Sequence, residues 1–285
     1  MLGKDMAPTA QVDIVLVQHL LNYWNGRGVD MNQLWPILRI DPELPLPRWV
    51  DTDRVADAYD FVARFLDDEL LAFDLGIYMA RREMPLQRLL RCAPSLRKGI
   101  EALIPYVYLS TGSLRYEIDT SQSDIVLISV ERHPERHVSP LQLSAAVVIM
   151  AGVCRDALGD SFEPEDLCMH LPQSEIADAA KAADITGIQV AETEGFYMLE
   201  ISQVAWNRDG PDPQPVLFKS VQRELIRQDQ RFREHLALYS ELKDILEMCL
   251  IRRNVSRRGS LISWVSVCEI SNADCALWVQ LTRTY

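Results

Sequence analysis

The sequence has few of the residues that covalent or metal chemistry requires. Its six cysteines are scattered along 285 residues without any CxxC pair, and only five histidines occur. Zinc sites and redox motifs use closely spaced residues of these types, so neither is indicated. GxSxG, HExxH and glycine-rich phosphate-loop patterns are also missing. We therefore expect a protein that is not an enzyme, with no catalytic residue, no metal, no cofactor and reduced cysteines.

Positive charge and long apolar runs are scarce as well. The chain has 29 Lys and Arg against 41 Asp and Glu, a formal charge of −12. This balance argues against non-specific nucleic-acid binding by the body of the protein. The longest apolar run, Leu141–Val153, is too short and too interrupted to cross a bilayer. The N-terminus has no basic segment followed by an apolar stretch, so we expect a cytoplasmic protein without a membrane partner.

Apolar residues at helical and strand spacing predict an α+β fold. Its central feature is a helix that starts at Ser95 and leads into β-prone segments. The other predicted helices are Asp13–Trp24, Met31–Leu38, one capped by Asp51, Leu70–Met79 in short pieces with a break at Gly76, Leu141–Leu158 and Ser174–Ala183. The predicted strands are Tyr106–Tyr108 and Leu114–Ile118 around the turn Ser110–Ser113, then Ile125–Val130, Leu167–Leu171, Ile188–Val190 and Phe196–Ile201, with a turn at 192–195 between the last two.

Three tyrosines give the sequence its candidate ligand site. Tyr106, Tyr108 and Tyr116 lie close together in the predicted hairpin, and Glu131 ends the next predicted strand. Aromatic side chains with a few converging polar groups are typical of pockets for small ligands. These four residues are therefore the predicted binding residues. The alternative is ordinary sheet packing, with the hydroxyl groups at the rim.

Two other groups of residues could suggest metal or acid–base chemistry. His133 and His137 are four residues apart beside Glu131, but a proline between them disfavours the regular helix that would put both on one face. Cys168 and His170 alternate along a predicted strand without a third ligand. A solvated loop and a half-buried strand are the simpler interpretations. An enzyme that uses Glu131, His133 and His137 stays as an alternative function.

The order of these elements resembles a known family. The helix "CAPSLRKGIEAL" leads to a hairpin, the helix "PLQLSAAVVIMAGVCRDALG" follows, and the strands in "ITGIQVAETEGFYMLEI" precede a proline-rich linker, Asp209–Pro215. Over about residues 10–256 this order resembles the ligand-sensing N-terminal region of AraC/XylS-type transcription regulators with an arabinose-binding-like domain. The resemblance implies N-terminal helices and a mixed helix and antiparallel-sheet sensor domain, followed by a helical linker.

The resemblance also implies the domain limits and the function. We expect an effector-sensing α+β domain at 1–215, a linker helix with the first helix of a DNA-binding module at 216–256, and an aberrant tail at 257–285. The implied partners are a small-molecule effector, promoter DNA only in an intact full-length form, and a second copy in a homodimer. The four predicted binding residues would then contact the effector.

The tail departs from the family pattern. Regulators of this kind continue with two helix-turn-helix units, whereas Ser260–Ile270 has no helical stripe of apolar residues. Read one base out of frame, Gly259–Arg283 permits VAHQLGIRVRNLQRRLRALGTTYQD, which resembles the first of those units. The codons of Trp264 and Trp278, each followed by valine, force glycine in that frame.

The hypothesis is therefore a single-base deletion near codon 257, with loss of DNA binding. Recognition-helix arginines are not encoded in this frame, so no DNA-binding residue is assigned. The alternative is a genuine short terminal segment. The protein would then be a stand-alone small-molecule-binding or dimerisation protein without DNA binding.

Overall fold

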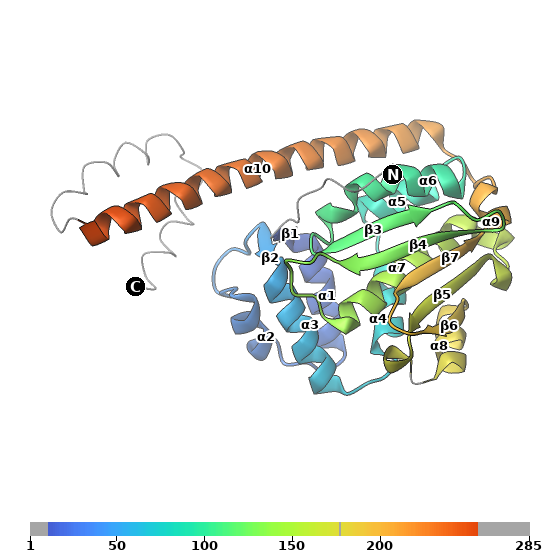
Figure 1. Ribbon diagram of the computed structural model, residues 1–285, viewed down its shortest axis with the longest axis horizontal. Helices are drawn as coiled ribbons and strands as arrows, with labels where there is room; N and C mark the ends of the chain where they lie inside the picture. Colours follow the sequence, from blue (N-terminus) through green and yellow to red (C-terminus); the bar gives the residue numbers. More distant parts are fainter. Residues whose placement is uncertain (1–10, 177, 256–285) are drawn as a thin grey trace. The chain divides into compact units, whose positions relative to one another are not determined.

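The protein is described by a computed structural model, which places residues 11–176 and 178–255. Packing divides the chain into two units at Asp229–Gln230, and each is described by itself. The predicted tail at 257–285 lies outside the described residues. The first unit has mixed helix and sheet, as Figure 1 shows, which confirms the predicted α+β class.

The N-terminal part of the first unit is helical. Short strands β1 (Gln11–Asp13) and β2 (Trp49–Asp51) pair antiparallel and bring together the starts of two helices. Asp13 caps α1 (Ile14–Gly26), and Asp51 caps α3 (Thr52–Leu66) through Oδ1 at 2.8 Å from the Asp53 amide nitrogen. The remaining helices of this part are α2 (Met31–Leu38) and α4 (Leu71–Ala80). These helices bury a continuous apolar core that includes Trp24 and Tyr59.

The second part of this unit is a five-stranded sheet in the order β3-β4-β7-β5-β6. The strands are β3 (Leu114–Asp119), β4 (Ile125–Arg132), β5 (Leu167–Pro172), β6 (Gln189–Thr193) and β7 (Met198–Ser202). All neighbours pair antiparallel except β5 and β6, which are parallel and are joined through α8 (Ala179–Thr186). Strands β6 and β7 are therefore not a hairpin, although the turn at 192–195 predicts one, because β5 lies between them.

Helix α7 (Pro140–Leu158) is the centre of the unit. It packs against β4, β5 and β7 on one side and against α4 on the other. Gly76 continues α4 without a break, so the predicted interruption is wrong. A Cβ at Gly76 would lie 2.5 Å from Val148 Cβ. The glycine therefore permits close approach of two helices.

The same helix is long and apolar enough to pass a test for a membrane span. The segment Pro140–Ser161 meets the criteria of length and hydropathy, but 83% of the tested window is buried within the protein. Burial of this kind is typical of the central helix of a soluble core. The apolar helix is longer than the run Leu141–Val153 suggests, because Pro140 starts it and Gly159 ends it.

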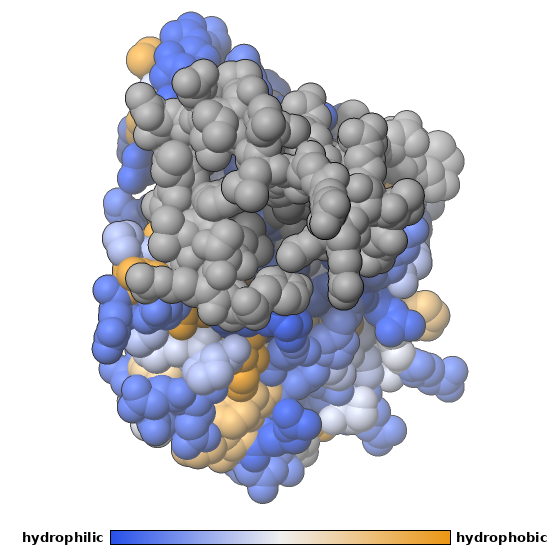
Figure 2. Space-filling view, turned by 90° about the vertical axis from the view of Figure 1, so that its left-hand side faces the viewer, coloured by the Kyte–Doolittle hydropathy of each residue, from blue (hydrophilic) through white to orange (hydrophobic). Residues whose placement is uncertain are grey.

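The remaining helices connect these parts. They are α5 (Pro85–Arg91), α6 (Leu96–Leu103), the 3-10 helix η1 (Ile104–Leu109), α9 (Gln203–Asn207) and α10 (Pro215–Val255). Short 3-10 turns η2 (Gly159–Ser161), η3 (Pro164–Asp166) and η4 (Gln173–Glu175) flank β5. The predicted helix at Ser174–Ala183 begins later, at Ala179, because Asp178 is its cap. Figure 2 shows mostly hydrophilic described side chains on one side of the molecule, with hydrophobic ones gathered low in the view.

Candidate functional site

A small cavity lies between the N-terminal helices and α7. Its volume is about 30 Å³, and its walls come from β1, α1, α3, α4, β3, α7 and the loop after η1. The polar residues among its lining are Thr52, Tyr59, Ser110, Thr111 and Gln142, and all the others are apolar. No Asp, Glu, Lys, Arg or His is among the residues that line it. The cavity is therefore an uncharged site with a few polar groups.

Two buried polar atoms beside this cavity have no hydrogen-bond partner among the described residues. They are Thr52 Oγ1 and Gln142 Oε1, on residues that are 1% and 8% exposed. Thr52 is the first residue of α3, and Gln142 lies in the first turn of α7. The other end of the Gln142 amide donates from Nε2 to Ser113 Oγ at 3.3 Å. Leaving such atoms unpaired costs roughly 1–3 kcal/mol each.

Two buried tyrosines are close to the same region. Tyr59 lines the cavity, and Tyr116 forms a side-chain hydrogen bond with Thr111, which also lines it. Burial raises the pKa of both phenols well above the usual value near 10, and Tyr116 raises that of Tyr59 further. Both hydroxyl groups thus stay protonated at neutral pH and add no charge to the site.

The structure separates the four residues that the sequence predicts to bind the effector. Tyr116 is buried on the face of the sheet that packs against α7, whereas Glu131 is exposed at the end of β4. Glu131 Oε2 accepts a hydrogen bond from Arg115 Nη2 at 2.6 Å. Tyr106 and Tyr108 lie in η1, so the predicted strand at these residues is wrong. This 3-10 helix starts at Ile104, directly after α6, with Pro105 in its first turn.

The outer face of the sheet carries paired polar and charged side chains instead. His170 Nε2 lies 2.9 Å from Glu200 Oε2, and Arg115 contacts both Glu117 and Glu131. Cys168 and His170 do share one face of β5, as the alternation predicts. His137 Nε2 lies 2.7 Å from Asp60 Oδ2. No cluster of three or more His, Cys, Asp or Glu residues that could hold a metal occurs in the part of the chain that the structure describes.

The proline-rich linker is fixed to the body of the first unit. Arg208 forms two ion-pair contacts with the buried Asp166, at 2.6 and 3.0 Å. The Gly210 amide then donates to Pro94 O at 3.0 Å, and the Gln214 amide donates to Cys92 O at 3.2 Å. A Cβ at Gly210 would lie 2.6 Å from Ala93 O, so the linker needs glycine there.

Helix α10 is joined to η1 by a side-chain contact about four turns after its start. The Tyr108 hydroxyl donates to Asp229 Oδ1, near the end of the first unit. Ser110 and Thr111, which line the cavity, follow η1 directly. One short segment thus contacts the cavity at one end and α10 at the other.

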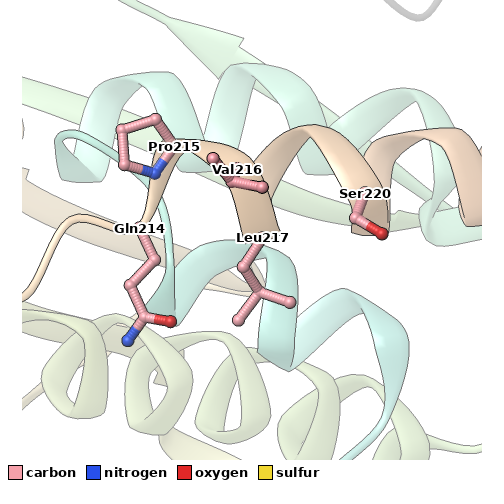
Figure 3. A pocket seen from close by; sticks show the side chains of 5 residues that line it. All are labelled: Gln214, Pro215, Val216, Leu217 and Ser220. Atoms are coloured by element: carbon pink, nitrogen blue, oxygen red, sulfur yellow. The ribbon is translucent and has the colours of Figure 1, made fainter.

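A second hollow lies at the beginning of α10, where Figure 3 shows Gln214, Pro215, Val216, Leu217 and Ser220. It is open to solvent, and Val216 is 85% exposed. None of these five residues contributes an unpartnered buried polar atom. The hollow therefore has no group that would select a ligand.

Sequence reasoning did not find Thr52 and Gln142. Each lies near the start of a helix, where polar residues are common for reasons of capping. Neither is near Tyr116 in sequence, and only the packing of α3 and α7 brings them to one cavity. A glutamine in the mostly apolar run from Leu141 to Val153, which also contains Ser144, was the signal present for Gln142.

Comparison with known proteins identifies the family. The family model "Arabinose-binding domain of AraC transcription regulator, N-term" matches residues 28–209, more than half of the chain. A crystal structure of the transcriptional regulator CdpR from Pseudomonas aeruginosa is 15% identical, with 85% of this chain and 74% of that chain covered and a TM-score of 0.47. No curated protein matches the chain. The predicted resemblance is confirmed for the matched region: the chain belongs to the family of AraC transcription regulators with an N-terminal arabinose-binding domain.

Proposed function

We propose that this protein is the effector-sensing part of a cytoplasmic transcription regulator of the AraC type. A small molecule binds the first unit and changes the placement or dimerisation of the C-terminal module. The family match supports the sensing role, since it covers most of that unit. The expected homodimer and promoter DNA are partners of an intact form. Residues 1–215 would hold the sensor, and 216–256 would hold the connection to the DNA-binding module.

The observation that carries this proposal is the connection between the cavity and α10. Ser110 and Thr111 line the cavity, and Tyr108 of the preceding turn donates to Asp229 of α10. The linker is held by backbone hydrogen bonds to Cys92 and Pro94, so α10 starts from a fixed point. A change in η1 therefore changes the contacts of α10 and gives two sites a physical coupling.

Of the four residues predicted to bind the effector, we propose different roles for two. Tyr116 is beside the cavity through its hydrogen bond to Thr111, and it contributes to ligand binding there. Tyr108 is a positioning residue, because it acts through Asp229. Glu131 is paired with Arg115 on the outer face of the sheet and does not reach the same ligand.

The sensing role is tested by a thermal-shift screen of metabolites, followed by hydrogen exchange on each compound that raises Tm. We expect at least one such compound, and we expect it to change amide exchange in 104–111 and in 215–229. In Tyr108→Phe the compound still binds, but its effect on 215–229 is lost. Binding without any change in 215–229 of the wild-type protein would contradict the proposal.

The proposed loss of DNA binding rests on the sequence after Ser256, which lies outside the described residues. We expect no sequence-selective binding of operator DNA in a gel shift with the purified protein. Tight selective binding would contradict this part. The nucleotide sequence from codon 254 onward separates the two interpretations of the tail. An open alternative frame that spells a second helix-turn-helix supports a truncated regulator, and an immediate stop in that frame supports a stand-alone ligand-binding protein.

A further inference from the structure

We propose that the cavity between α1, α3, α4 and α7 binds a neutral, largely apolar small molecule through one hydroxyl or amide group. This inference rests on the proposed function, because it assigns the effector site and its chemical class. The binding groups are Thr52 Oγ1 and Gln142 Oε1, supported by Thr111 and Tyr116.

The unpartnered atoms give the first argument. Buried polar groups are nearly always hydrogen-bonded, because each one left unpaired loses its hydration without compensation. Here two such atoms lie on residues of one small cavity. Gln142 Oε1 accepts, and the Thr52 hydroxyl can donate or accept. A ligand hydroxyl or amide can donate to Gln142 Oε1 and also exchange a hydrogen bond with the Thr52 hydroxyl.

The absence of charge from the lining gives the second argument. A carboxylate or ammonium group in this cavity would lose its hydration and would have no opposite charge among the residues that line it. The charged pairs of the sheet, such as Arg115 with Glu131, lie on the outer face instead. The site therefore rejects ionised compounds and accepts neutral ones with the same carbon skeleton.

The size of the cavity shows how a ligand would enter. About 30 Å³ is room for one or two water molecules, so a larger ligand widens the site as it binds. Leu16, Ser110, Thr111 and Ile149 are the half-buried members of the lining, and Met79 has an adaptable side chain. Widening at Ser110 and Thr111 would displace η1 and hence Tyr108. Binding and the signal to α10 thus use the same movement.

The test is a titration of purified protein carrying 13C-methyl methionine, with the Met79 resonance assigned from the Met79→Leu variant. The probes are isobutanol, isobutyrate and isobutylammonium, which share a carbon skeleton and differ in charge. We expect isobutanol to shift the Met79 resonance in a saturable way, and the two ions to bind at least about 100-fold more weakly. No shift with isobutanol, or an equal response to isobutyrate, would overturn the proposal.

Two variants test the assigned groups. Thr52→Val and Gln142→Leu should each weaken isobutanol binding by about tenfold. The matched controls Thr120→Val and Gln122→Leu change exposed residues of the turn between β3 and β4, and should leave binding unchanged. If Gln142→Leu fails to fold, Thr52→Val still tests the assignment. Valine has nearly the shape of threonine, so this variant should keep the packing of the wild type. Unchanged affinity in Thr52→Val would overturn the assignment.

The two proposals fail in different ways. If metabolites act on α10 but isobutanol does not reach Met79, the regulator function stands and this site assignment is wrong. If isobutanol binds at Met79 but no compound changes exchange in 215–229, the site stands and its role in sensing is wrong.

Discussion

The buried and the exposed polar groups of this protein are organised in opposite ways. On the outer face of the sheet, Arg115 is paired with Glu117 and Glu131, and His170 with Glu200. In the interior, Thr52 Oγ1 and Gln142 Oε1 have no partner among the described residues and no charge nearby in the cavity they line. The outer-face side chains already lie beside oppositely charged or polar partners, whereas the two inner atoms would gain a hydrogen bond from a ligand. The difference points to the interior as the sensing site.

The alternation of strand residues produces this separation. Tyr116 and Arg115 are neighbours in β3, yet the first is buried and the second lies on the other face of the sheet. Glu131 is directly opposite Arg115 in the strand register, so its side chain lies on the same outer face of the sheet. Strand alternation therefore separates Tyr116 from Glu131, while Tyr106 and Tyr108 lie outside the sheet in η1.

The largest expected effect is the difference in unfolding free energy between removing a buried ion pair and removing a surface one. Asp166 is nearly fully buried and holds Arg208 at the start of the linker, whereas Glu131 holds Arg115 at the surface. Asp166→Ala should reduce the free energy of unfolding by about 3–5 kcal/mol, since it leaves the positive charge of Arg208 without its carboxylate partner. Glu131→Ala should cost less than about 1 kcal/mol. Denaturant titration measures both losses of unfolding free energy. Equal losses would contradict the expected difference between the buried and the surface ion pair.

The next effect concerns the helix pair behind the sheet. Gly76→Ala should destabilise the protein by about 1–3 kcal/mol, because the added Cβ meets Val148. Helix propensity alone predicts the opposite sign, a gain of up to about 1 kcal/mol. Gly26→Ala, where nothing lies within 4 Å of the added carbon, is the matched control. A stabilised Gly76→Ala protein in thermal unfolding would show that α4 and α7 are not packed this closely.

The smallest effect is on a thiol of the outer face. Burial, followed by the charge of Glu200, raises the pKa of Cys168 from 9.0 to about 11. Alkylation of Cys168, followed by peptide mass spectrometry, should therefore reach half its maximal rate near pH 11, and Glu200→Gln should move this midpoint down. Because the unfolded thiol ionises first, the contribution to stability is complete below about pH 9 and is lost as pH rises toward 11. A midpoint near 9 in the wild-type protein would contradict the burial of this side chain.

The parts of the fold that local signals determine could be predicted from the sequence. Asp13, Asp51 and Ser95 cap helices that begin where the sequence indicates. The long helix α7 begins at Pro140 and is capped by Gly159, at the positions where a proline and a glycine in the sequence indicate its ends. These features depend on residues within one turn of each other, so no knowledge of distant packing is needed.

The parts that depend on distant packing could not be predicted. In the sequence Gly76 predicts a helix break. In the structure it instead leaves room for Val148 of the neighbouring helix α7. The parallel pairing of β5 and β6 places β5 between two strands that are joined by a short turn. The candidate site is of the same kind, since Thr52 and Gln142 become neighbours of one cavity only after α3 and α7 pack.

If the uncharged cavity is held ready for a ligand, the unpaired groups that line it lower the stability of the free protein. The most direct measurement is the free energy of unfolding of the wild-type protein and of Thr52→Val, each with and without isobutanol. Without isobutanol, Thr52→Val should be more stable by about 1 kcal/mol, because it removes an unpaired buried hydroxyl. The alcohol at about ten times its Kd should stabilise the wild type by about 1.4 kcal/mol and the variant far less. A Thr52→Val protein that is less stable than the wild type, and equally stabilised by isobutanol, would contradict the account.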